Sequence, residues 1–160
     1  MLEPFIEIHT DGAASGNPGP GGYGIVLKFK HHRKEMSGGF KHTTNNRMEL
    51  LAVIIALESV SNNDLHVKVF CDSKYVVDAI NLKWLQGWRK TGFKNKANVD
   101  LWLRFLKIYN PKKHEFIWVK GHASNPENNR CDELAVAASK QPNTVEDIGY
   151  DANRNNRLLD

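Results

Sequence analysis

The sequence predicts an α/β fold: a mixed five-stranded sheet, three antiparallel strands and then two parallel ones, with helices packed on it. Three strand-like segments at the start are joined by short connections, which indicates an antiparallel meander. Apolar residues then follow helical and strand periods in alternation, which is typical of parallel strands joined by helices. The length of 160 residues suits one domain with one core.

The first half of the chain supplies the meander. Residues 5–10 are apolar and β-branched and predict a strand that ends at Asp11. Residues 12–24 are rich in glycine and contain two prolines, so we expect a turn region there. Two further strands are expected over residues 23–29 and 34–42, joined by a basic turn at residues 30–33.

The second half alternates between helices and strands. Residues 43–46 offer N-cap side chains for a helix over residues 48–60. The elements expected after it are a strand over residues 65–70, a helix from Ser73 to about Asn81, an irregular basic segment over 84–98, a helix over 99–110, a strand over 115–119 and a helix over 127–139. We assign residues 1–140 to the domain and expect residues 141–160 to form a polar, partly disordered tail.

Composition sets only broad limits. The net charge of +4 and the pI of about 9.1 are compatible with a polyanionic partner but do not establish one. Cys71 and Cys131 are too few and too far apart for a disulfide framework or a thiolate zinc site, so we expect two buried apolar residues in a reducing compartment. Because we find no bilayer-spanning run and no secretory signal, we expect a cytoplasmic protein without membrane contact.

Four acidic residues stand beside predicted structural boundaries. Asp11 and Asp72 each end a strand, and a right-handed crossover makes those two strands parallel, so both acids face the edge where α/β sheets bind ligands. Glu49 lies about one turn into the crossover helix, and Asp132 lies early in the last helix, but the pattern alone does not settle whether they reach that edge. Each acid taken singly could instead be a cap or a turn residue.

Four clustered carboxylates would require a cation, because like charges raise one another's pKa. Oxygen ligands without a cysteine or histidine cluster favour Mg²⁺ or Mn²⁺ over zinc. Two such ions about 3.5–4 Å apart can bind the attacking water and the leaving oxygen of a phosphodiester. The residues therefore indicate a metal-dependent nuclease.

Five ordered motifs surround these acids. They are Thr10–Gly12 with Gly16–Gly24, Thr43–Leu50, Cys71–Ser73, Gly121–Ala123 and Asn128–Ala135. In this order the motifs resemble bacterial-type ribonuclease HI, in the ribonuclease H family, and the resemblance runs from about Phe5 to about Tyr150. It implies the ribonuclease H-like fold and a catalytic domain.

The resemblance implies endonucleolytic hydrolysis of the RNA strand of RNA–DNA hybrids, without strong sequence specificity, giving 5′-phosphate and 3′-hydroxyl ends. It assigns Asp11, Glu49, Asp72 and Asp132 as catalytic metal ligands for two Mg²⁺ ions, which Mn²⁺ can replace. His122 resembles the family histidine that assists proton transfer or product release; otherwise it is a surface loop residue. We expect a monomer with no obligate protein partner.

The resemblance also assigns a set of residues that contact the hybrid. They are Asn17, Asn45 and Asn46 for the minor groove, Thr44 and Asn98 for a phosphate of the DNA strand, and Trp84, Trp88, Arg89, Lys90 and Lys94 on a basic handle. The alternatives are that Asn45 and Asn46 only cap the helix and that the tryptophans belong to the core. Three departures from the family pattern are His42 in place of arginine, a shorter handle over residues 93–98 and a loop at 123–125 without glycine.

Two other functions remain open at this point. A DNA resolvase or exonuclease could share this fold, although the asparagine set and the basic handle favour a hybrid substrate. A non-catalytic hybrid-binding module is the second alternative, and the retention of all four acids argues against it.

Overall fold

The computed structural model describes residues 3–121 and 124–150. One sheet is formed by β1 (Phe5–Ala14), β2 (Gly19–Phe29), β3 (His32–Thr43), β4 (His66–Cys71) and β5 (His114–Trp118). Its strand order is β3-β2-β1-β4-β5, with antiparallel pairs among the first three strands and parallel pairs from β1 to β4 and from β4 to β5. The predicted mixed sheet is confirmed.

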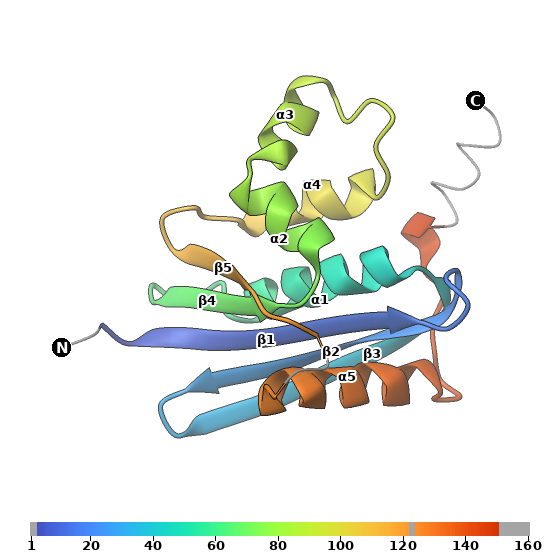
Figure 1. Cartoon of the computed structure of the whole chain (residues 1–160), viewed down its shortest axis with the longest axis horizontal. Coiled ribbons are helices and arrows are strands. Elements are labelled where there is room, and N and C mark those ends of the chain that lie inside the picture. The colour runs from blue at the N-terminus through green and yellow to red at the C-terminus, as the bar shows by residue number, and fades with distance from the viewer. Residues whose placement is uncertain (1–2, 122–123, 151–160) are drawn as a thin grey trace.

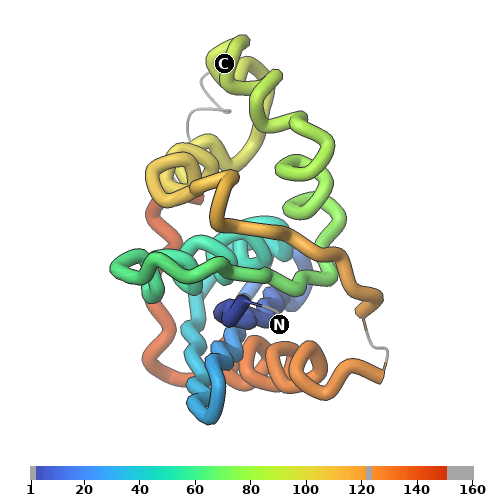
Figure 2. Tube along the Cα trace, turned by 90° about the vertical axis from the view of Figure 1, so that its left-hand side faces the viewer, coloured from blue at the N-terminus to red at the C-terminus, as the bar shows by residue number. Residues whose placement is uncertain are grey.

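The helices cover both faces of this sheet (Figures 1 and 2). They are α1 (Asn45–Ser59), α2 (Lys74–Asn81), α3 (Trp84–Lys90), α4 (Val99–Ile108) and α5 (Pro126–Ser139). Helix α5 packs alone on one face, whereas α1 lies on the other face beneath α2 and α4. In the part of the chain that the structure describes, no helix is both long and apolar enough to cross a membrane.

Helix α1 is the centre of the core. Thr44 caps it by accepting a hydrogen bond from Arg47 N, and ten of its residues are buried. A helix that is apolar on nearly all sides must be enclosed, and α1 is enclosed by the sheet and by α2 and α4. Trp102 and Phe105 of α4 are fully buried against the same core.

The glycine-rich stretch expected to be a turn is mostly strand, and that expectation was wrong. The turn covers only residues 15–18. Gly22 and Gly24 lie within β2 because α5 passes directly over them: a Cβ on Gly24 would lie 2.2 Å from the carbonyl oxygen of Cys131. These glycines permit close packing of a helix on a strand, which the sequence pattern does not distinguish from a turn.

The basic segment after α2 also differs from expectation. Its first half is the helix α3, which with the following turns projects beyond the sheet as an arm over residues 83–98 (Figure 1). Trp88 packs edge-on against buried Trp102, with ring centroids 5.8 Å apart, while Trp84 stays 46% exposed. One tryptophan therefore anchors the arm and the other faces solvent.

Residues 141–150 belong to the folded structure rather than to a disordered tail. Val145 forms backbone hydrogen bonds with Gly39 and Lys41 at the edge of β3. Asp147 is buried, with only 7% of its surface exposed. The remainder of the expected tail, residues 151–160, lies outside the described residues.

Candidate active site

The register of the sheet places Asp11 and Asp72 next to each other. Thr10 of β1 pairs with Cys71 of β4, so the following residue on each parallel strand is an aspartate. Strand β1 does not end there as expected, because its pairing with β2 continues to Ala14. Asp11 therefore stands where β1 loses its partner β4 but still has β2, in a rigid part of the sheet.

Glu49 reaches the same point from the first turns of α1. Gly12 makes this possible: a Cβ at this position would lie 2.4 Å from the backbone nitrogen of Glu49, so only glycine allows α1 to come this close to β1. Glu49 is 8% exposed and forms a side-chain hydrogen bond with Asp11. The position that the sequence left open is thus fixed by a helix–strand contact.

The pKa values of Asp11 and Glu49 are raised because these acids are buried close to one another. Burial raises the pKa of Asp11 from the ordinary 3.8 to about 7; the hydrogen bond with Glu49 opposes this rise, and the charges of Asp72 and Asp132 add to it. Burial also raises the pKa of Glu49 well above its usual value, with further contributions from the neighbouring acidic groups. Such a group of carboxylates ionises fully only beside a cation.

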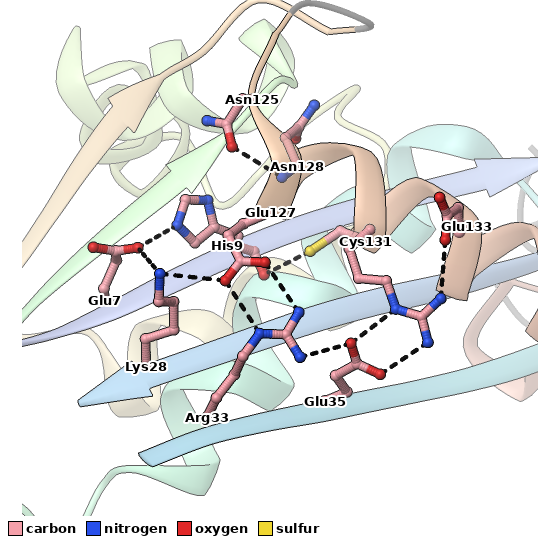
Figure 3. Close-up of polar contacts among 11 residues, drawn as sticks. Glu7, His9, Lys28, Arg33, Glu35, Asn125, Glu127, Asn128, Cys131 and Glu133 are labelled. Atoms are coloured by element: carbon pink, nitrogen blue, oxygen red, sulfur yellow. Dashed lines mark hydrogen bonds and ion pairs between the residues drawn. The ribbon is translucent and has the colours of Figure 1, made fainter. Parts of the chain in front are cut away.

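Asp132 comes from α5, on the other face of the sheet, and lies close enough for its charge to act on Asp11. An ion-pair network fastens α5 in place (Figure 3). The carboxylate of Glu127 in α5 accepts hydrogen bonds from Arg33 and forms an ion pair with Lys28, both from the meander. The guanidinium of Arg130 donates hydrogen bonds of 2.8 and 2.9 Å to Glu35 of β3. Asp132 lies two residues beyond Arg130, on the helix that this network holds against the sheet.

The donor set fits a hard divalent cation. Ligand atoms of Glu49, Cys71 and Asp72 all lie within 4.8 Å of one another. Burial raises the pKa of the Cys71 thiol to about 12, so the thiol stays protonated and the carboxylates remain as ligands. Oδ1 of Asp72 is buried and has no hydrogen-bond partner among the described residues, as expected for an oxygen that awaits a ligand.

The expected substrate-binding residues lie in two places: around the N-terminal end of α1, and on the arm. Asn17 Oδ1 accepts a hydrogen bond from Asn45 N at 2.9 Å and so satisfies a free N–H in the first turn of α1. Asn45 Oδ1 accepts from Ala14 N and joins α1 to the end of β1. Asn46 is exposed on the first turn of α1. Thr44 and Asn98 both bond Arg47, whereas Arg89, Lys90 and Lys94 are exposed on the arm.

Two histidines were singled out by the family pattern, His122 and His42. His122 lies outside the described residues, although Gly121 beside it is so close to Asp72 that a Cβ would lie 2.8 Å from Oδ2. His42 is half-buried, and its ring lies 5.6 Å from that of Tyr150.

Sequence reasoning missed Trp118 and Lys74, which flank Asp72. Trp118 is 42% exposed at the end of β5, and the Nζ of Lys74 lies 4.8 Å from the centre of its ring. The signal was available, because Trp118 ends a strand parallel to β4 and thus stands at the same edge as the acids.

A family model described as RNase H matches residues 3–140. The chain belongs to the ribonuclease H family. A protein of Desulforamulus reducens named Ribonuclease H is 55% identical over 148 residues, covering 89% of this chain and 92% of that protein. A second Ribonuclease H, from Trichodesmium erythraeum, is 51% identical over 91% of this chain and 95% of its own length. The protein is accordingly a ribonuclease H enzyme.

Solved ribonuclease H structures share the fold. LC9-RNase H1, a type 1 RNase H with the type 2 active-site motif, is 28% identical with a TM-score of 0.74, over 87% of this chain and 74% of that one. LC11-RNase H1, solved in complex with an RNA/DNA hybrid, is 30% identical with a TM-score of 0.61, over 83% of this chain and 95% of that one.

Proposed function

We propose that this ribonuclease H cleaves the RNA strand of RNA–DNA hybrids endonucleolytically, leaving 5′-phosphate and 3′-hydroxyl ends, without strong sequence specificity. The observation that carries the proposal is the cluster of Asp11, Glu49 and Asp72, with Asp132 facing it from the opposite layer. The relative solved with an RNA/DNA hybrid supports the choice of substrate.

Asp11, Glu49, Asp72 and Asp132 would hold two Mg²⁺ ions, with Mn²⁺ as a substitute. When bound, the ions supply an activated water and stabilise charge on the leaving oxygen. Burial of Asp11 and Glu49 keeps bulk water from the ligand oxygens, and the unpartnered Oδ1 of Asp72 is free to bind. His122 would assist proton transfer or product release, as the resemblance implies.

Recognition would be independent of base sequence. The exposed Asn17, Asn45 and Asn46 would offer amide groups to 2′-hydroxyls and sugars in the minor groove. Thr44 and Asn98 would bind a phosphate of the DNA strand. The exposed arm residues Trp84, Arg89, Lys90 and Lys94 would contact the DNA backbone, with Trp88 as their anchor. A monomer, a cytoplasmic location and the absence of an obligate protein partner stay predictions.

One substrate panel tests the proposal. A single end-labelled RNA is digested alone, paired with DNA and paired with RNA, each with and without Mg²⁺, beside a duplex DNA of the same sequence. We expect cleavage only of the hybrid and only with metal. Preferential cleavage of duplex DNA would instead support a resolvase or exonuclease.

A variant pair tests the site. Asp72→Asn removes one ligand oxygen and should abolish cleavage while leaving hybrid affinity intact, because the arm and the asparagines lie outside the metal cluster. Asp64→Asn, an exposed aspartate in the turn before β4, is the matched control and should cleave normally. Full activity in Asp72→Asn would mean that the site lies elsewhere.

A further inference from the structure

Arg47 forms a buried ion cluster that joins three distant parts of the chain. It is 1% exposed and lies on α1. Its Nη1 and Nη2 atoms each bond Asp100 of α4 at 2.8 Å. Its Nε and Nη2 atoms bond Asp147, in the segment after α5, at 2.8 and 3.0 Å.

Contacts of the segment over residues 141–150 hold Asp147 in this cluster. Thr43 donates its hydroxyl to Asp147 Oδ2 at 2.6 Å, which fixes the carboxylate at the end of β3. Gly149 then passes so close that a Cβ would lie 2.0 Å from Asp100 Oδ2 and 2.7 Å from Arg47 Nη2. The segment therefore closes tightly over the guanidinium.

The fifth N–H of the guanidinium reaches toward the expected substrate surface. An arginine side chain has five N–H donors, and four of them are used by the two aspartates. The remaining one, on Nη1, bonds Asn98 Oδ1 at 3.4 Å. The backbone nitrogen of Arg47 also donates to Thr44 Oγ1 at 3.2 Å, so Thr44 and Asn98 are both held by this one residue.

Asn98 also bonds to residues at the base of the arm. Its Nδ2 donates to the Tyr75 hydroxyl at 3.1 Å, and the same hydroxyl accepts from Trp102 Nε1 at 2.9 Å. The Trp102 ring packs edge-on against Trp88, which anchors the arm. An unbroken series of contacts thus leads from Asp147 to the arm.

We propose that Asp147 is a positioning residue for hybrid binding: through the Arg47 guanidinium it orients Asn98, and it makes the C-terminal segment part of the substrate-binding apparatus. This inference rests on the proposed function, which gives Asn98 and Thr44 their phosphate. A buried guanidinium that has lost its buried carboxylate partner Asp147 must find other partners or water, so it no longer presents a fixed N–H to Asn98. Asp147 itself touches neither substrate nor metal.

The inference predicts a change in KM and not in kcat. In the full chain, Asp147→Asn should raise KM for a hybrid roughly 3- to 10-fold, the loss expected from one misplaced hydrogen bond, with kcat within about twofold of the parent. Gly149→Ala should do the same, because its methyl group displaces Asp100 from Arg47. The second variant keeps the test decisive if the first does not fold.

Two controls separate positioning from loss of stability. Glu58→Gln breaks an exposed ion pair with Arg104 that also joins α1 to α4 but lies far from Asn98. Leu57→Ala opens the buried end of α1 and lowers the unfolding midpoint without touching Arg47. All variants are assayed far below their unfolding midpoints, and both controls should keep the parental KM.

The outcomes are distinct. An unchanged KM in both Asp147→Asn and Gly149→Ala, or an equal rise in Leu57→Ala, would overturn the positioning role. The proposed function is judged separately by parental cleavage of the hybrid and its loss in Asp72→Asn. If the parent cleaves hybrids and both Asp147→Asn and Gly149→Ala keep the parental KM, the positioning role of Asp147 is rejected and the proposed function stands.

Discussion

Trp118 donates its indole N–H to the backbone carbonyl oxygen of Asp72 across 3.1 Å. This bond joins the last residue of β5 to the acid that follows β4, at the edge where the candidate metal ligands meet. The orientation of Asp72 thus depends on a neighbouring strand as well as on its own.

Replacing Trp118 by phenylalanine should therefore weaken metal binding. The ring and its stacking under Lys74 are largely kept, but the hydrogen bond to Asp72 is lost. We expect the Mg²⁺ concentration for half-maximal cleavage to rise about 2- to 10-fold. Metal titration of the cleavage rate measures this, with Trp84→Phe on the arm as the control; equal shifts in both variants would contradict the positional role of Trp118.

The raised pKa of Asp11 predicts an unusual dependence of stability on pH in metal-free protein. The folded state holds a proton on Asp11 up to about pH 7, whereas the unfolded chain releases it near 3.8, so the folded state binds more protons between these values. The contribution of Asp11 to the free energy of unfolding therefore falls as pH rises from about 4 to 7.

Thermal unfolding in EDTA at several pH values tests this sign. Asp11→Asn should remove this part of the pH dependence and unfold at a higher temperature than the parent at pH 8, although it should not cleave. Mg²⁺ should stabilise the parent more at pH 8 than at pH 5. Parallel pH profiles for parent and variant would show that Asp11 titrates normally.

Gly12 and Gly87 form a matched pair for alanine substitution. A methyl group on Gly12 would collide with the backbone of Met48 and Glu49, so Gly12→Ala should cost about 1–3 kcal/mol of stability and reduce cleavage by moving Glu49 away from Asp11. Gly87 has no atom near its virtual Cβ and lies inside α3, so Gly87→Ala should stabilise the helix by up to about 1 kcal/mol. Denaturant unfolding and cleavage rates distinguish the two.

The arm should determine the salt dependence of binding. Each lysine that contacts a phosphate adds about one unit to the slope of log affinity against log salt, so removing Lys90 and Lys94 together should flatten that slope by about one to two units. Lys30, in the turn between β2 and β3, and Lys34, near the start of β3, are the control pair. A slope unchanged from the parent would mean that the arm does not touch the hybrid.

The sequence predicted the sheet well because its strands are marked by local signals. Apolar alternation marks β1 and β4, and the right-handed crossover between them leaves Asp11 and Asp72 at one edge. Glu49 was harder, because its place depends on how closely α1 approaches Gly12, a distance between segments that no local pattern encodes.

The errors have similar physical causes. Gly22 and Gly24 indicated a turn, yet they serve the close passage of α5 over β2. Helix α3 was missed because it is short and basic, and it is held by buried Leu85 and by Trp88 against Trp102. Asp147 was hidden in a polar stretch, since its burial depends on an arginine 100 positions earlier.

The arrangement of α1 and α5 on opposite faces of the sheet has a consequence for synthesis of the chain. Glu49 is delivered from one layer and Asp132 from the other, so an incomplete polypeptide that stops before Pro126 lacks one of its four acids. Under the proposed mechanism such a polypeptide would lack a metal ligand, so cleavage would require α5 to be folded against the sheet.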